Sequence, residues 1–389
     1  MKLKNKIFIT YFFLFILIFL SLGVLIGVFT RQLFLVQRET LLTVVVNSEA
    51  EKIEYFLNGK KEIIAVVAAS TVFRDFLNLS SESFNYQTEQ ERSNKRLIRT
   101  IEADPEIETM ALLDATGKVV AYTNDIDKDQ DKSKDPYFVY GKEKEYFKDV
   151  YDSPLGIRVF SVSAPIIDEE TKQFVGVIVA RIKPDMLYKI VGMSEGMGKT
   201  GETFLVSKDR YFLSPSKYLG SGVILKEKVD TVNVDNCFST ADQEAGKDEA
   251  SESASTHIGH LSVLEAKDYR GVLSMVTHRY IPETGWCLVA KMDQEEVMAP
   301  IRDFFVYLFG IGVVTLILLN ISNVFITSGM TRALEELMKA AERFRKGDFN
   351  VSIKEEGKDE MTKLAQVMNL MAKELKGLYG NLESEVQKK

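Results

Sequence analysis

The chain has 389 residues, of which 46% are hydrophobic and 27% are charged, and its formal net charge is −7 at pH 7. This length allows two or three domains. The acidic balance, without a basic stripe interleaved with aromatic residues, argues against a nucleic-acid binder because phosphate backbones would repel it. The two cysteines, Cys237 and Cys287, are too few for a disulfide framework.

The N-terminal segment predicts a membrane helix. Residues 1–6 carry three lysines, and the apolar run over residues 7–29 is long enough to cross the roughly 30 Å hydrocarbon core of a bilayer. A cleaved signal peptide is the alternative, but its apolar core would be about 7–15 residues long and would precede a small-residue cleavage site. This run is longer and ends in FTRQLFLV. We therefore expect a cytoplasmic N-terminus and a first transmembrane helix.

The segment over residues 30–303 opens with one long helix. Its apolar positions share one face, which we expect to pack against the rest of the segment. This face comprises Leu42, Val45, Ile53, Phe56, Ile63 and Val67. Charged residues are expected off this face, namely Glu49, Glu51, Lys60 and Lys61. The pattern predicts a stalk that becomes the spine of an external domain.

Strand patterns follow in two α+β units, about residues 80–190 and about 196–297. In the first, residues 80–90 are polar and loop-like, after which IETMALLD, VVAYT, RVFSVSAPII and FVGVIVARI predict strands and PDMLYKIV a closing helix. In the second, the predicted strands are ETFLVS, YFLSPS, YRGVLSMVTHRY and WCLVAKM. Residues 238–256 are rich in small and acidic residues, so we expect them to be mobile.

A second apolar run over residues 304–326 predicts another transmembrane helix, and two amphipathic patterns follow it. Their apolar residues have coiled-coil spacing: Leu334, Leu337, Ala341 and Phe344, then Leu364, Met368, Met371, Leu375, Leu378 and Leu382. In the connector, Gly347 and Asp348 can end a helix. Basic residues precede the first span and follow the second, so the positive-inside rule puts both termini in the cytoplasm.

These two patterns resemble the HAMP domain of bacterial transmembrane receptors. The resemblance is carried by LEELMKAAERFRKGDF, by Asp359-Glu360 and by LAQVMNLM, although Ala333 and Thr362 stand where the family usually has proline and glycine. It implies a parallel four-helix bundle in a homodimer over residues 327–380, with residues 381–389 starting a signalling coiled coil. An amphipathic tail that docks on another protein is the alternative.

The external segment resembles the double Cache sensor domain. The matching stretches are DPYF, SVSAPIID, GVIVARI, GKTGETFLV and GWCLVAKM, and the resemblance covers about residues 33–297. It implies an α+β sensor with a long stalk helix and two PAS-like antiparallel-sheet units, held between two transmembrane helices and followed by a cytoplasmic α-helical HAMP bundle.

The resemblance also implies where a ligand binds. Amino-acid-binding members have an arginine before the Pro-aromatic pair and an aspartate at the end of the Gly-Val strand, whereas this chain has Asp135 and Arg181 there. Because both charges are reversed, we expect an organic acid or another small anion. The expected ligand-binding residues are Tyr137, Tyr146, Arg158, Ser161 and Arg181. Alternatively, the two arginines pair with carboxylates such as Asp168.

Three other features predict little chemistry. Gly198-Lys199-Thr200 lacks the earlier glycine of a phosphate-binding loop, because Met193 stands there, so we expect a turn. His257 and His260 form an HxxH pair without placed partners, so we expect no metal and no cofactor. A Cys237–Cys287 pair is possible outside the cell, but packing of Cys287 as a small apolar residue is favoured.

Residues 327–389 contain no histidine, no Gly-rich nucleotide loop and no paired-carboxylate catalytic site, so we expect no catalytic residues and no enzyme activity. We expect a two-pass homodimeric sensor of the bacterial plasma membrane that binds a small external molecule and acts on a cytoplasmic partner or on an output module beyond Lys389. In the receptors that this chain resembles, the output module is a histidine kinase, chemoreceptor or cyclase module. A scaffold protein that binds another protein or the cell envelope is the alternative. A channel is disfavoured because Asn320, Ser322 and Asn323 are the only polar cluster in the second span.

Overall fold

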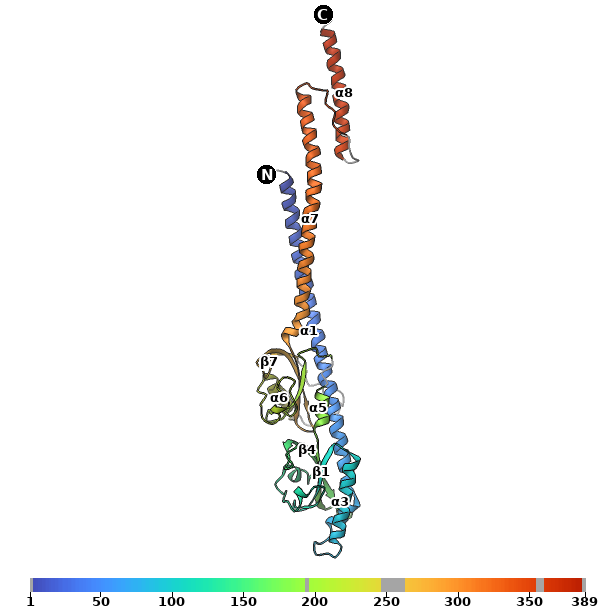
Figure 1. Ribbon diagram of the computed structural model, residues 1–389, viewed down its shortest axis with the longest axis vertical. Helices are drawn as coiled ribbons and strands as arrows, with labels where there is room; N and C mark the ends of the chain where they lie inside the picture. The colour runs from blue at the N-terminus through green and yellow to red at the C-terminus, as the bar shows by residue number, and fades with distance from the viewer. Residues whose placement is uncertain (1–2, 193–195, 246–262, 355–359, 387–389) are drawn as a thin grey trace. The chain divides into compact units, whose positions relative to one another are not determined.

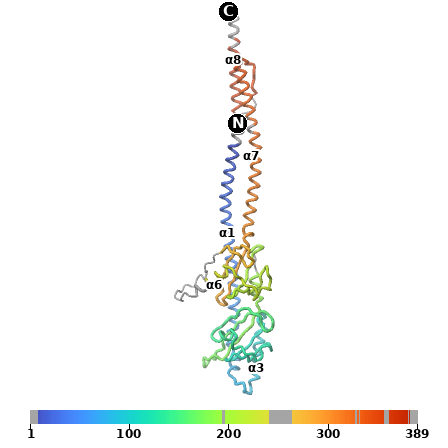
Figure 2. Tube along the Cα trace, turned by 90° about the vertical axis from the view of Figure 1, so that its left-hand side faces the viewer, coloured from blue at the N-terminus to red at the C-terminus, as the bar shows by residue number. Residues whose placement is uncertain are grey.

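The computed structural model describes residues 3–192, 196–245, 263–354 and 360–386. The chain divides into unit 1, formed by residues 1–31 and 301–389, and unit 2, formed by residues 32–300. Figures 1 and 2 show the course of the chain through both.

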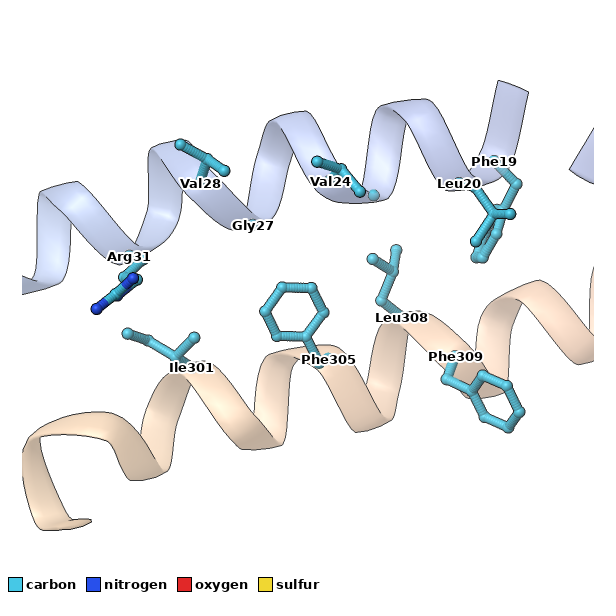
Figure 3. Close-up of a pocket in the computed structure, with 11 residues that line it drawn as sticks. Phe19, Leu20, Val24, Gly27, Val28, Arg31, Ile301, Phe305, Leu308 and Phe309 are labelled. Atoms are coloured by element: carbon cyan, nitrogen blue, oxygen red, sulfur yellow. The ribbon is translucent and has the colours of Figure 1, made fainter. Parts of the chain in front are cut away.

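Two helices that are long and apolar enough to cross a membrane contribute to unit 1. α1 (Leu3–Ala68) begins in this unit and α7 (Gln294–Arg345) ends in it. A Cβ atom on Gly27 of α1 would clash with the ring of Phe305, and one on Gly312 of α7 would clash with the ring of Phe19. Each helix therefore packs an aromatic ring of the other against a glycine, and Figure 3 shows the Phe305 ring facing Gly27.

The rest of unit 1 is a helical pair. α7 ends at Arg345 and is followed by Gly347, whose φ of 85° favours glycine. α8 (Glu360–Val386) then runs in the same direction as α7 (Figure 1). The connector between them is fixed by the Asn369 side chain, which pairs with both the N–H and the C=O of Ile353 at 2.8 Å.

The first sheet of unit 2 has five antiparallel strands in the order β2-β1-β5-β4-β3. The strands are β1 (Ile107–Asp114), β2 (Val119–Tyr122), β3 (Tyr146–Asp152), β4 (Arg158–Ile167) and β5 (Phe174–Ile182). The helices α2 (Thr71–Leu77) and α3 (Tyr86–Ala103) pack beside it (Figure 1). α5 (Asp185–Val191) leads into the second sheet.

The second sheet has four antiparallel strands in the order β6-β9-β8-β7. The strands are β6 (Glu202–Val206), β7 (Leu264–Lys267), β8 (Leu273–Ile281) and β9 (Trp286–Asp293). α6 (Val232–Ala245) covers β8 and β9, and a disulfide joins Cys237 of α6 to Cys287 of β9. The expectation that Cys287 packs as a free apolar residue is therefore wrong.

Several expected segments differ in the structure. YFLSPS forms only isolated bridges, since Tyr211 pairs with Lys228 while Phe212 pairs with Val206, and Pro215 has no N–H to extend a ladder. The expected loop over residues 80–90 already contains the start of α3, and the expected mobile stretch contains the end of α6. Residues 246–256 of that stretch lie outside the described residues, as does the HxxH pair.

The part of α1 in unit 2 is the spine of both sheets, because its buried residues share one core cluster with them. Two charged residues that we expected off the packing face are on it: Glu49 is 3% exposed and Lys60 is 7% exposed. The Lys60 Nζ atom lies 2.6 Å from carboxylate oxygens of both Asp104 and Glu106. The ion pairs explain how a lysine can be buried here.

Candidate ligand-binding site

One face of the first sheet belongs to a buried cluster separate from the one that contains α1. Alternation along β5 puts Arg181 on the same side as Val177 and Val179, which pack in this cluster with Tyr137 of α4 (Pro136–Val139). Side chains at the end of β5 therefore meet the segment that leads into β3.

Strand register brings four polar residues into one row across this face. Thr109 lies opposite Arg181, Arg181 lies opposite Ser161, and Ser161 lies opposite Lys148. Because directly opposed residues have Cβ atoms about 4.5–5.5 Å apart, the row provides hydroxyl groups and cations at one level of the sheet.

A cavity of about 320 Å³ includes two members of this row in its wall. The size is at the lower end of the about 300–1,000 Å³ that small-molecule sites occupy. Most of its lining residues are polar or charged: Lys132, Asp135, Tyr137, Lys148, Tyr151, Asp152, Ser153, Pro154 and Arg181.

Arg181 forms a buried ion pair beneath the cavity. Its Nη1 atom lies 2.5 Å and its Nη2 atom 2.8 Å from the two carboxylate oxygens of Asp127, and Nη1 also donates to the Thr109 hydroxyl at 3.0 Å. Burial opposes its charge, but the hydrogen bonds and the attraction to Asp127 outweigh this and raise the pKa of Arg181. Its Nε atom has no hydrogen-bond partner among the described residues.

Lys148 is held at the cavity wall by two aromatic rings and a carboxylate. Its Nζ atom lies 4.1 Å from the ring centre of Tyr151, 5.2 Å from that of Tyr137 and 3.4 Å from Asp135. Asp135 also accepts from the Tyr137 hydroxyl at 3.0 Å and lies 3.8 Å from the Nζ atom of Lys132. Burial, together with the Asp135 charge, raises the pKa of Tyr137.

A turn in the second half of unit 2 binds a protein carboxylate. The backbone N–H groups of Lys199 and Thr200 each donate to Glu296 at 2.7 Å, and the Thr200 hydroxyl donates to it at 2.5 Å. Gly198 has a φ of 71°, and a Cβ atom there would clash with Glu296. Burial opposes the charge of Glu296, but these donors outweigh it and lower its pKa. The expected turn thus holds the start of α7.

Residues 29–301 match the family model of the Cache domain, and residues 325–377 match that of the HAMP domain. The chain belongs to the Cache-domain family. Both domains are non-catalytic signalling modules, and with two apolar helices they make the chain a signalling sensor of the inner membrane. Its Cache domain has the expected α+β architecture, with a long helix and two antiparallel sheets.

Several solved sensor domains are similar to this Cache domain. The ligand-binding domain of the Campylobacter jejuni chemoreceptor Tlp3 in complex with 4-methylisoleucine is 13% identical, with a TM-score of 0.48 over 68% of this chain and 94% of that chain. The sensor domain of the V. cholerae histidine kinase DctB is 15% identical, with a TM-score of 0.46 over 66% and 98%. The domain of the Pseudomonas aeruginosa amino acid chemoreceptor PctC with GABA is 15% identical, with a TM-score of 0.45 over 66% and 99%. No curated protein sequence matches the chain.

The five expected ligand-binding residues occupy different places in the Cache domain. Tyr137 and Arg181 line the cavity. Ser161 lies behind the lining, where its Oγ atom is 2.7 Å from the Tyr151 hydroxyl oxygen. The structure therefore brings these three residues to one region of the sheet.

Tyr146 and Arg158 are not among the residues that line the cavity. The ring of Tyr146 stands 5.0 Å from that of Tyr140, and the Nε atom of Arg158 lies 3.4 Å from Asp152. Both expected arginines thus have carboxylate partners, as the alternative expectation allowed. Asp168 is not one of them, because it accepts from Asn78 and Thr171 instead.

Lys148, Tyr151 and Asp152 of the cavity wall were missed because the sequence did not predict β3. Its register shifts between Lys148 and Tyr151, so Phe147 and Val150 are both buried although three residues apart. This bulge breaks the alternation of period two that identifies a strand. A search that allowed one extra residue in YFKDVYD would have detected it.

Proposed function

We propose that the Cache domain binds a small organic acid or another small anion in the cavity above Arg181. The proposal places residues 30–303 outside the cell and residues 327–380 in a cytoplasmic HAMP bundle of a homodimer. Lysines before the first span and arginines after the second support this orientation.

The charges at the cavity carry the proposal. Asp127 engages Arg181 and Asp152 engages Arg158, whereas Asp135 is shared by Lys132 and Lys148. Four cations thus meet three carboxylates, which leaves one positive charge in excess. A carboxylate ligand between the two lysines would receive charge-assisted hydrogen bonds, and the cation of an α-amino acid would compete with them for Asp135.

A binding screen tests the ligand class. The full chain in lipid nanodiscs is heated with organic acids, amino acids and amines, and the affinity of each stabilising compound is then measured by calorimetry. We expect organic acids to bind and Lys148→Met to weaken them about 10-fold or more, because a hydrogen bond to a charged group contributes about 1.5–3 kcal/mol. Exposed Lys142→Met is the matched control. Stabilisation by amino acids alone, or equal affinity in Lys148→Met, would refute the proposal.

We infer that the signal reaches α7 through Glu296. Support comes from the hydrogen bonds that tie this carboxylate to Lys199 and Thr200, next to β6 of the second sheet. A shift of that turn of about 1–2 Å, which is typical of interface switches, would pull on the first turn of α7. The HAMP helices would then change packing.

A cysteine introduced at Leu378 reports this change. The two native cysteines are bonded to each other, so the new thiol can cross-link protomers without competition. With an organic acid found in the screen, we expect Glu296→Gln to bind normally but to lose the ligand-induced change in cross-linking, because an amide cannot accept all the N–H donors. Glu295→Gln, on the exposed neighbouring residue, should behave like the wild type. A full response in Glu296→Gln would exclude this route.

A further inference from the structure

Glu49 is a buried carboxyl group without a partner. It lies on the face of α1 that packs against the second sheet, it is 3% exposed, and neither of its oxygens has a hydrogen-bond partner among the described residues. Lys60, the other buried charge on the helix, contacts two carboxylates. A buried carboxylate without donors is costly, and the group avoids the cost by remaining protonated.

Thr203, which Glu49 approaches, belongs to a row of neutral side chains on the second sheet. Thr203 of β6 pairs in register with Ala290 of β9, and Ala290 pairs with Thr277 of β8. All three are at most 3% exposed, and the Thr277 hydroxyl also has no hydrogen-bond partner in the described structure. The polar neighbour that Glu49 approaches is Thr203.

While its hydroxyl bonds Val191, Thr203 can serve only the protonated form of Glu49. Its hydroxyl donates its single hydrogen to the carbonyl oxygen of Val191, so its oxygen is left as an acceptor. A protonated Glu49 can donate to this oxygen. An ionised Glu49 would place its negative charge against an acceptor lone pair, which is repulsive.

The charged groups around Glu49 do not neutralise it. On α1 the nearest cation is exposed Lys52, whose attraction is weaker than the effect of burial. On β8, Arg279 reaches α1 but its Nη2 atom bonds Glu54 at 3.2 Å, with Glu51 at 3.9 Å from Nη1. The charged residues Glu202 of β6 and Lys291 of β9 are the sequence neighbours of Thr203 and Ala290. Because side chains alternate along a strand, they lie on the face of the sheet opposite to Thr203.

The helix behind Thr203 adds no partner. α5 carries the titratable groups Asp185, Tyr188 and Lys189, and no ion pair or hydrogen bond joins them to Glu49 in the described part of the chain. Burial outweighs both influences that would favour ionised Glu49, namely a hydrogen bond from Thr203 if its hydroxyl turned away from Val191 and the attraction of Lys52, so the environment favours the neutral acid.

We propose that Glu49 is a proton-binding site through which the receptor responds to external pH. Protonated Glu49 lets α1 pack on the Thr203-Ala290-Thr277 row, and loss of the proton places an unpaired charge in that contact and loosens it. The ligand here is the proton, so the proposal does not depend on the anion cavity. Since α1 continues into unit 1 as one helix, a change in its packing is positioned to act on the membrane segment.

The sign of the pH effect follows from burial, which raises the pKa of Glu49 to about 7 from 4.5. The folded chain then binds more protons than the unfolded chain between these values. The stability that Glu49 contributes is complete below about pH 4.5 and is lost as the pH rises through about 7.

The test compares the full wild-type chain in nanodiscs with Glu49→Gln, which mimics the neutral acid, and with Glu62→Gln, which changes an exposed glutamate of the same helix. We expect the melting temperature of the wild type and of Glu62→Gln to fall relative to Glu49→Gln as the pH rises from about 5 to about 8. Parallel curves for all three chains would overturn the proposal.

Infrared spectroscopy of the same samples reports the proton directly. We expect the wild type to show carbonyl-stretching intensity of a protonated carboxyl that fades near neutral pH, and we expect Glu49→Gln to lack the part of this intensity that comes from Glu49. Hydrogen exchange of α1 should be faster in the wild type than in Glu49→Gln near pH 8, and equal near pH 5, where both side chains are neutral. If the same band intensity faded in Glu49→Gln as in the wild type, or if exchange were equal at both pH values, Glu49 would not be the site.

Discussion

Arg181 of β5 and Lys291 of β9 occupy corresponding positions in the two sheets of the Cache domain. Each follows Val-Ala in its strand, and each faces the first strand of its sheet, where Thr109 opposes Arg181 and Glu202 opposes Lys291. Both are almost fully buried, at 3% and 0% exposed.

Each of these two cations binds an aspartate from outside its own strand. Arg181 binds Asp127, and the Nζ atom of Lys291 lies 2.7 Å from Asp268. The rings of Tyr218 and Tyr269 lie over Lys291, with centres 4.7 Å and 5.1 Å from Nζ. Each sheet of the Cache domain therefore contains a buried cation that is paired with an aspartate. In the first sheet this pair borders the cavity, whereas in the second sheet aromatic rings cover the cation.

The first prediction concerns the buried pair of Arg181 and Asp127. Asp127→Asn should lower the free energy of unfolding by about 3–5 kcal/mol, because it leaves the arginine buried without a counter-charge. Replacing both residues with apolar ones, Arg181→Met with Asp127→Leu, should recover most of this loss. Asp230→Asn, which breaks the exposed contact with Arg210, should cost at most about 1 kcal/mol. Chemical denaturation gives all three values, and equal costs for the two single variants would contradict the burial argument.

The second prediction concerns His278, which opposes the pH effect of Glu49. Burial lowers the pKa of His278 to about 4, and its Nδ1 atom lies 2.8 Å from the Asn233 side-chain oxygen. As the pH falls, His278 is therefore protonated in the unfolded chain before it is protonated in the folded chain. The stability of the folded chain is lost as the pH falls from about 6.5 towards 4. Denaturation at several pH values should show a loss of at most about 3 kcal/mol for the wild type. The loss should be absent in His278→Gln, and a pH profile shared by both chains would exclude His278 as its source.

Hydrophobic patterning predicted the layout of this receptor but not its site. Long apolar runs and regular strands such as β5 are specified locally, so their positions could be read from the residues. β3 is not specified in this way, because its bulge interrupts the alternation of buried and exposed residues. The strand was therefore not predicted, and Lys148 was not recognised as a cavity residue. Glu49 was expected on the solvent-facing side of α1 because charge normally marks that side, and only the tertiary contact with β6 shows that it is buried.

The third prediction concerns the dimer. Within one chain, α8 packs on α7 through buried Ala365 and half-buried Met368, whereas Leu364 and Met371 are 46% and 53% exposed. The expected seam is thus partly free to contact a second chain. Leu364→Asp or Met371→Asp should destabilise a dimer by about 3 kcal/mol or more, because each would bury a charge.

Gln366→Asp is the control for the dimer, since it adds the same charge on the opposite side of the helix. Disulfide formation between protomers with an introduced cysteine at Leu378 should fall in Leu364→Asp and remain in Gln366→Asp. Cross-linking that is unaffected by Leu364→Asp would rule out this seam.

The last prediction concerns the membrane helices. Gly27→Val should disturb the contact between α1 and α7, because a Cβ atom there meets the Phe305 ring, whereas Gly310→Val introduces the same side chain into open space on α7. Overpacking of this kind costs about 1–3 kcal/mol. Phe305→Ala should relieve the clash in the double variant, so the effects of the two changes will not be additive. Thermal unfolding in detergent should therefore rank Gly310→Val with the wild type, Gly27→Val lowest, and the double variant above Gly27→Val. If Gly27→Val and Gly310→Val lowered the melting temperature equally, the loss would come from a valine in a membrane helix in general. It would not come from the specific contact between Gly27 and the Phe305 ring.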